Sequence, residues 1–151
     1  MSYINKPGKT TASRLMIIRQ QVTDMIAYHE IKTTLTKAKE TQKHIEKLIT
    51  LSKKDTIANR RLATKLLLDN QKICAKDAIK YLFETIGPVF KNRAGGYTRV
   101  LKLGKRQGDA TEIAILQFVD KIPAFKKKTK VASKKDSPAL KVETKPIVSN
   151  V

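Results

Sequence analysis

The sequence predicts an α+β domain in two layers, with helices packed on a small three-stranded mixed sheet. Apolar residues recur at helical spacing in four segments, and three others are β-branched or alternate apolar with polar residues. The predicted order is α-β-α-α-α-β-β, and helices grouped between strands in this way are typical of the α+β class. With 151 residues and 40% apolar content, the chain is long enough to bury a core.

The first half is predicted to contain a helix, a strand and a second helix. The first helix begins at one of three residues suited to N-capping, namely Thr10, Thr11 and Ser13. Its buried stripe is predicted to be Leu15, Ile18, Val22, Met25 and Ile26. The β-branched run 30–35 predicts a strand. Thr36 is then expected to cap a helix over about 37–53, with an inner face of Ala38, Ile45, Leu48 and Ile49.

Two further helices and two strands follow. Asp55 is the expected cap of a third helix that buries Leu62 and Leu66. A fourth helix covers about 75–86, with a stripe of Ala78, Ile79, Leu82, Phe83 and Ile86, and the Gly87-Pro88 pair is expected to end it. Strands are predicted at 97–103 and 111–119, and the turn between them is marked by Gly104, Gly108 and Asp109.

The predicted domain covers residues 11–120 and lies between two basic segments. Residues 1–10 are predicted to form a basic N-terminal arm. Residues 121–151 carry a net charge of +7 and three prolines without apolar periodicity, which predicts an extended or disordered lysine-rich tail. No segment has the roughly 20 apolar residues of a membrane helix or the apolar centre of a signal peptide. The single cysteine, Cys74, is expected to be a small packing residue in a protein of the reducing cytosol.

The net charge of +19 implies a polyanionic partner, with nucleic acid favoured over a membrane surface. The strongest local signal is the run 93–99, which lies in a stretch without acidic residues from 85 to 108. Paired glycines allow close backbone approach, arginines offer forked donors for phosphate, and a tyrosine offers a flat face. We therefore expect a compact cationic loop that binds nucleic acid through Lys91, Arg93, Gly95, Gly96, Tyr97, Arg99, Lys102, Lys105 and Arg106.

Other cations are candidate phosphate ligands on the arm and on two helices. These are Lys6, Lys9, Arg14, Arg19, Arg60 and Arg61, although adjacent arginines such as the last two are also common on solvated helix faces.

No catalytic, cofactor or metal site is predicted. His29 and His44 are isolated, Cys74 has no evident base, and the turn is the expected role of Asp109. The glycine run lacks the Gly-Lys-Ser/Thr sequence of a nucleotide-binding loop.

Several segments in order resemble the bacterial large-subunit ribosomal protein family numbered seventeen. The resemblance spans about residues 8–120 and rests on segments 29–40, 48–54, 58–61, 82–88 and 93–99, with a similar closing strand through 116–120. It implies a two-layer α+β fold and a cytoplasmic, non-enzymatic protein of the large ribosomal subunit. It also implies binding to 23S ribosomal RNA near the polypeptide exit region, with neighbours that include the small protein numbered thirty-two.

This chain departs from the family pattern at three places. Residues 2–5 lack the usual dense basic run, and Val89 stands where an arginine is common. The tail after Asp120 belongs to a region whose sequence varies among family members. The alternatives are a free DNA-binding or nucleoid protein, which explains the charge but not the ordered segments, and a small RNA-directed enzyme, for which the chain offers no convergent base or metal ligands.

Overall fold

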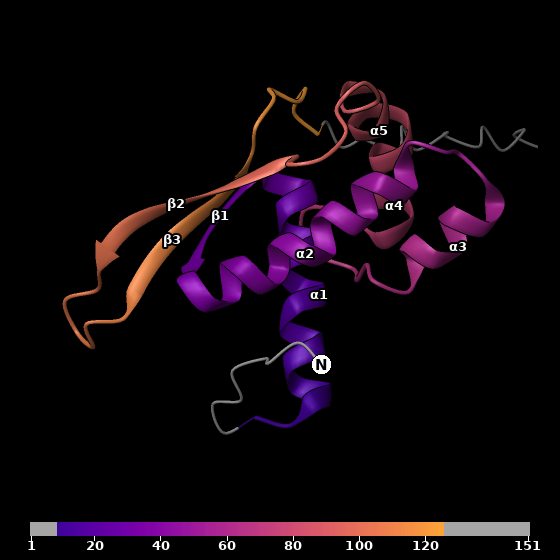
Figure 1. Cartoon of the computed structure of the whole chain (residues 1–151). Coiled ribbons are helices and arrows are strands. Elements are labelled where there is room, and N and C mark those ends of the chain that lie inside the picture. The colour runs from indigo at the N-terminus through magenta and orange to yellow at the C-terminus, as the bar shows by residue number, and fades with distance from the viewer. Residues whose placement is uncertain (1–8, 126–151) are drawn as a thin grey trace, which may run out of the picture.

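The computed structural model describes residues 9–125 and confirms an α+β domain with three strands (Figure 1). Lys6, most of the predicted arm and the tail from residue 126 lie outside the described residues. The elements in chain order are α1 Thr11–Tyr28, β1 Glu30–Thr34, α2 Leu35–Ser52, α3 Ile57–Thr64, α4 Ala75–Tyr81, the π-helical turn η1 Leu82–Ile86, α5 Gly87–Val89, β2 Thr98–Lys105 and β3 Glu112–Phe118.

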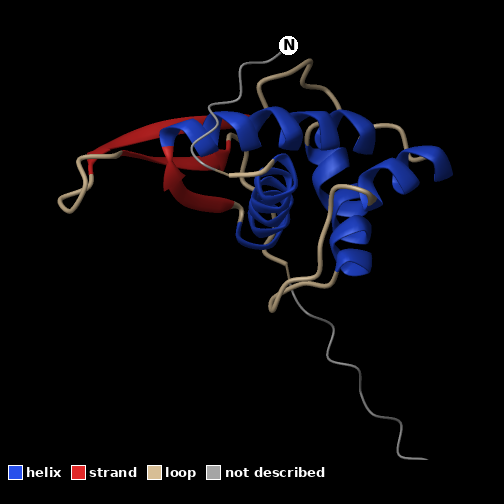
Figure 2. Cartoon of the chain, turned by 90° about the horizontal axis from the view of Figure 1, so that it is seen from below, coloured by secondary structure: helices blue, strands red, loops and turns tan. Residues whose placement is uncertain are grey.

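The sheet has the strand order β1-β3-β2, and both pairings are antiparallel. The expectation of a mixed sheet is therefore wrong. The direction of β1 relative to β3 depends on how the intervening helices return the chain, which a local pattern does not record. Helices cover one face only, and β2 and β3 extend beyond them as a projecting hairpin (Figures 1 and 2).

The core lies between the helices and the covered face of the sheet. Alternate residues of β3, Ala114, Leu116 and Phe118, are buried there, while the intervening ones face the open side. They meet α2, whose predicted inner face is buried as expected at Ala38, Ile45, Leu48 and Ile49. Two residues assigned to apolar stripes, Leu15 and Leu62, are instead 47% and 46% exposed.

Helix starts are partly as predicted. Thr10 caps α1, with its hydroxyl accepting from the Ser13 amide at 3.3 Å. The other two predicted caps are wrong: α2 begins directly after β1 with Thr34 as its N-cap, and α3 is capped by Thr56 rather than Asp55. The Asp55 carboxylate instead accepts from the Arg60 guanidinium.

The Gly87-Pro88 pair does not end the fourth helix, because the chain continues through η1 into α5. A Cβ added at Gly87 would lie 2.8 Å from the Ser52 carbonyl oxygen, so the glycine permits close packing against the end of α2. A tertiary contact, not a helix stop, explains this glycine.

The described chain packs on the core beyond β3. The Tyr81 hydroxyl donates to the Pro123 carbonyl and lies 2.8 Å from His29 Nε2, and the Phe125 ring contacts the Tyr81 ring edge-on with centroids 5.4 Å apart. Burial raises the pKa of Tyr81 to about 12. Among the described residues no helix combines the length and apolar content that a membrane span requires.

Candidate nucleic-acid interface

The segment 90–97, called the glycine loop below, is fixed to the core at several points. Phe90 and Tyr97 are buried and their rings meet edge-on, with centroids 5.4 Å apart. The Lys53 ammonium donates to the Arg93 carbonyl and lies 4.7 Å from the Tyr97 ring centroid. Arg93 Nη2 lies 3.0 Å from Asp120 Oδ1, so its guanidinium is tied to the segment just after β3. The loop is therefore preorganised by the fold.

Tyr97 does not present a face for stacking on a base, because the residue is only 2% exposed. Its hydroxyl donates to the Ala94 carbonyl at 3.3 Å, and the nearby Lys53 ammonium lowers its pKa. We therefore correct the prediction that Tyr97 contacts RNA and assign it to the core. An aromatic residue at the start of a strand fits both roles, and the sequence does not distinguish them.

The two loop glycines differ in backbone conformation. Gly96 has φ +63°, in the left-handed region, whereas Gly95 does not have a positive φ. No atom lies within 4 Å of a Cβ built at either position. The backbone conformation therefore favours glycine only at position 96. At Gly95 the open space leaves the backbone free for close approach by another molecule.

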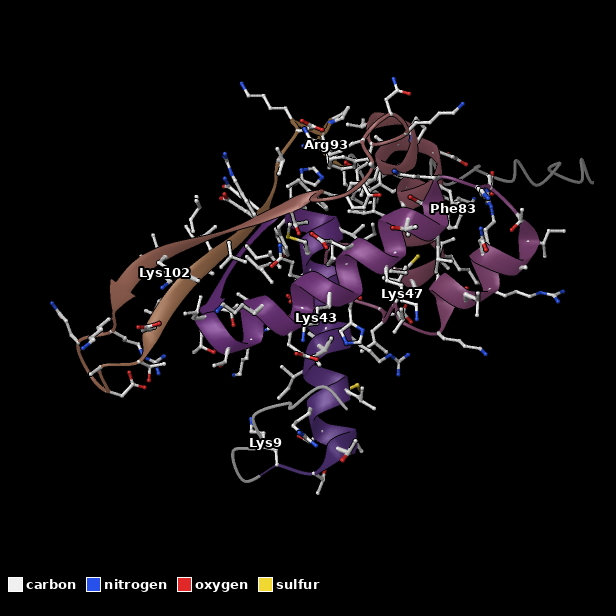
Figure 3. All side chains as sticks on the ribbon, viewed as in Figure 1. Lys9, Lys43, Lys47, Phe83, Arg93 and Lys102 are labelled. Carbon is white, nitrogen blue, oxygen red and sulfur yellow. The ribbon has the colours of Figure 1, made fainter. Side chains whose placement is uncertain are left out.

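The cations of this region do not form the single compact patch that we expected. They are spread along the chain from the glycine loop through edge strand β2, where Arg99 and Lys102 lie on opposite faces of the sheet. This set is called the cationic ladder below: Lys91, Arg93, Arg99, Lys102, Lys105 and Arg106. β2 has eight residues, about 26 Å of chain at ~3.3 Å per residue. Arg93 and Lys102 accordingly lie well apart in Figure 3.

The far end of the cationic ladder is held by local contacts. Arg106 Nε donates to Asp109 Oδ1 at 2.9 Å, and the Thr111 amide donates to the same oxygen at 3.2 Å. The Arg106 guanidinium holds the pKa of Asp109 well below its usual range. Asp109 is thus confirmed as a turn residue. Both partners are exposed, and screening by water limits what this ion pair adds to stability.

The cations predicted on α1 lie away from the cationic ladder. Lys9 is exposed at the beginning of the helix, at the opposite end of the molecule from Arg93 (Figure 3). Arg14 and Arg19 are half-buried, and Nε and Nη1 of Arg14 and Nε of Arg19 have no hydrogen-bond partner among the described residues. These arginines keep donors that the described part of the fold does not use.

The adjacent arginines of α3 have different environments. Arg60 forms a two-point ion pair with Asp55, at 2.6 and 2.7 Å, and its guanidinium lies 5.2 Å from the Phe83 ring centroid. Arg61 is exposed. Much of the donor capacity of Arg60 is used inside the chain, so Arg61 is the more available of the two.

A lysine row on α2 was not predicted from the sequence. Lys39, Lys43 and Lys47 are exposed and separated by four residues, which places them on one side of the helix (Figure 3 labels the last two). Lys43 pairs with Glu40 at 3.2 Å. The four-residue spacing of the lysines was a usable signal, because it repeats on the exposed side of the helix as the apolar stripe does on the buried side.

The described residues contain no group of three or more His, Cys, Asp or Glu side chains that could hold a metal ion. Cys74 is exposed at the N-cap of α4, 3.1 Å from Asp77 Oδ2, so its predicted packing role is wrong. His29 ends α1 with φ +67° and is hydrogen-bonded, as expected for an isolated histidine.

Comparison with known proteins gives a consistent result. The family model described as ribosomal protein L17 matches residues 17–119. The large ribosomal subunit protein bL17 of Ureaplasma parvum serovar 3 is 58% identical over 119 residues, covering 79% of this chain and 100% of the relative. The proteins of the same name from Malacoplasma penetrans and Mycoplasma genitalium are 56% and 53% identical, covering 79% and 80% of this chain and 100% and 98% of the relatives. The chain belongs to the ribosomal protein L17 family.

Proposed function

We propose that this chain is a structural, non-enzymatic constituent of the large (50S) ribosomal subunit in the bacterial cytoplasm, where it binds 23S ribosomal RNA and stabilises its folding near the polypeptide exit region. Family membership supports the subunit assignment. The RNA-binding part rests on the cationic ladder, which extends from the glycine loop through edge strand β2 within a stretch that has no acidic residue from 85 to 108.

The mechanism is electrostatic and architectural. The fixed glycine loop holds Arg93 at one end of the cationic ladder, and the hairpin carries Lys105 and Arg106 toward the other. Cations spaced along a projecting strand suit phosphates on converging RNA segments, because each contact releases condensed counterions. Double-stranded RNA is recognised mainly through its shape and backbone, so little sequence readout is expected from these residues.

Neighbouring large-subunit ribosomal proteins are a second class of expected partner. They include the small protein numbered thirty-two. The open face of the sheet supports a protein contact, because Leu101 is 43% exposed there and pairs with the half-buried Ile115. Leu103 at the adjacent bulge is 51% exposed. Apolar side chains left uncovered next to each other commonly mark contacts with other proteins.

Gradient sedimentation of a cell lysate tests the subunit assignment. We expect the chain to migrate with large subunits at moderate salt and to be released by high salt, with the log of affinity falling by about 0.7–0.9 per phosphate contact for each unit of log salt. Migration with chromosomal DNA, unaffected by ribonuclease, would contradict the proposal and favour a nucleoid protein.

A further inference from the structure

A polar cleft of about 430 Å³ opens between α1, β1 and the segment before α4. Its α1 wall carries Gln20, Asp24 and Tyr28, which are spaced by four residues and share one side of the helix. Lys32 lines it from β1, an edge strand with one unpaired side, and Asn70 lies opposite. None of these residues belongs to the cationic ladder.

The cleft contains two hydrogen-bond acceptors that the described chain does not use. Asp24 Oδ1 accepts from Gln20 Nε2 at 3.3 Å and from the side-chain Nδ2 of Asn70. Asp24 Oδ2 and Gln20 Oε1 have no hydrogen-bond partner among residues 9–125. Burial raises the pKa of Asp24, although the Gln20 hydrogen bond opposes this. A partly desolvated carboxylate on so basic a chain therefore lacks donors for one of its oxygens.

The rim of the cleft has an aromatic ring and two cations. Tyr28 is 49% exposed, and the Lys72 ammonium lies 4.1 Å from its ring centroid. Lys32 is exposed on the strand side. A half-exposed ring offers area for stacking, and lysines beside it suit flanking phosphates. A carboxylate inside the cleft repels phosphate, which favours a base rather than the RNA backbone as the inserted group.

We propose that this cleft binds one unpaired guanine of the RNA, an inference that rests on the proposed function. The unused oxygens of Asp24 and Gln20, whose side chains are joined by a 3.3 Å hydrogen bond, require two donors. Guanine alone offers two neighbouring donors on its Watson–Crick edge, at N1–H and the N2 amino group. Adenine and cytosine place an acceptor nitrogen beside a single amino group, and uracil places one donor between two carbonyls. Asp24 and Gln20 accept from the guanine edge, and Tyr28 stacks on the base, as is common for single-stranded RNA.

Chemical probing with kethoxal, which modifies unpaired guanine at N1 and N2, tests the proposal in assembled large subunits. The subunits are prepared from cells whose only copy of the chain is wild type, Asp24→Asn, Tyr28→Ala or Tyr28→Phe. Asp77→Asn is the matched control, because it makes the same charge change at an exposed site on α4. Thermal melting and subunit incorporation check the folding of each variant.

We expect one guanine to be protected with the wild type, with Asp77→Asn and with Tyr28→Phe, which keeps the ring. The same guanine should lose its protection with Asp24→Asn and with Tyr28→Ala. Guanine reactivity that is the same for the wild type and both cleft variants would overturn the cleft proposal, as would a change confined to adenine or cytosine. Saturable binding of free GMP with no change in ribosomal RNA reactivity would also overturn it. Absence of the wild-type chain from large subunits would instead overturn the proposed function.

Discussion

The glycine loop and the hairpin tip take their cations from one acid-free run of sequence, but the fold holds them differently. At the loop, Arg93 is tied to Asp120 and its carbonyl accepts from Lys53, while Phe90 and Tyr97 are buried below. At the tip, residues 101–110 are exposed throughout. The core therefore sets the position of the loop cations, whereas the cations at the tip depend on local pairing and on the molecule that binds them.

The two regions should differ most in how much stability the protein loses when a large side chain is removed. Tyr97→Ala should lower the free energy of unfolding by about 3–5 kcal/mol, because it leaves a cavity beside Phe90. The matched change at the tip, Leu103→Ala, should alter it by less than about 0.5 kcal/mol because that side chain is 51% exposed. Urea unfolding of both variants measures the difference. Similar decreases in stability would show that the hairpin is as much part of the core as the loop.

The two glycines inside the loop should also differ in how well they tolerate a side chain. Gly96→Val should cost about 1–3 kcal/mol, since a β-branched residue is strained at φ +63°. Gly95→Val should leave the stability of the isolated chain nearly unchanged, because space is open around the added Cβ and φ is not positive. Thermal unfolding compares the two. A fall in subunit incorporation for Gly95→Val without a fall in stability would locate a close RNA approach at that backbone.

Paired cation removals compare the function of the two regions. Two double variants are compared: Arg93→Ala with Arg99→Ala, and Lys102→Ala with Lys105→Ala. Each should reduce the slope of log affinity against log salt by about 0.7–0.9 for every phosphate that is no longer neutralised. The Arg93 and Arg99 pair should weaken affinity more at constant salt, because Arg93 is already fixed by its ion pair with Asp120 and gives up less side-chain entropy on binding. Filter binding to 23S ribosomal RNA over a salt series measures both quantities. Equal decreases in affinity would show that fixation of the loop has no effect on binding.

The smallest expected effect is a pH dependence at the end of α1, outside both regions. Burial first and then the charge of Lys72 lower the pKa of His29 from 6.5. The unfolded chain therefore binds more protons, and stability should fall as pH drops through about 6.5. His29→Asn suits the left-handed backbone and should flatten the profile between pH 7 and 5. Denaturation at several pH values checks this, and an unchanged profile would assign the dependence to another group.

The order of elements was predictable because helical and alternating patterns are local properties. The exceptions depend on distant residues. Gly87 looks like a helix stop until the Ser52 carbonyl is placed 2.8 Å from its missing Cβ. Leu15 continues a regular apolar stripe, but its side chain is 47% exposed.

The candidate site was predictable as a set of cations but not as a shape. The sequence placed Arg93 and Lys105 in one short run, and only the strand between them shows that they lie far apart. Tyr97 was misassigned because a tyrosine is equally suited to stacking and to packing. The cleft at Asp24 was not predictable, since its walls come from α1, β1 and the segment before α4, which no single stretch of sequence records.

Crosslinking in living cells can show whether the cationic ladder contacts 23S ribosomal RNA. Ultraviolet crosslinks from purified large subunits would be mapped to both the peptide and the RNA nucleotide. We predict crosslinked peptides from residues 91–106 joined to 23S ribosomal RNA, with contacts at both the glycine loop and the hairpin. Crosslinks that join this segment to chromosomal DNA, or large subunits in which 91–106 yields none while other parts of the chain do, would contradict the account.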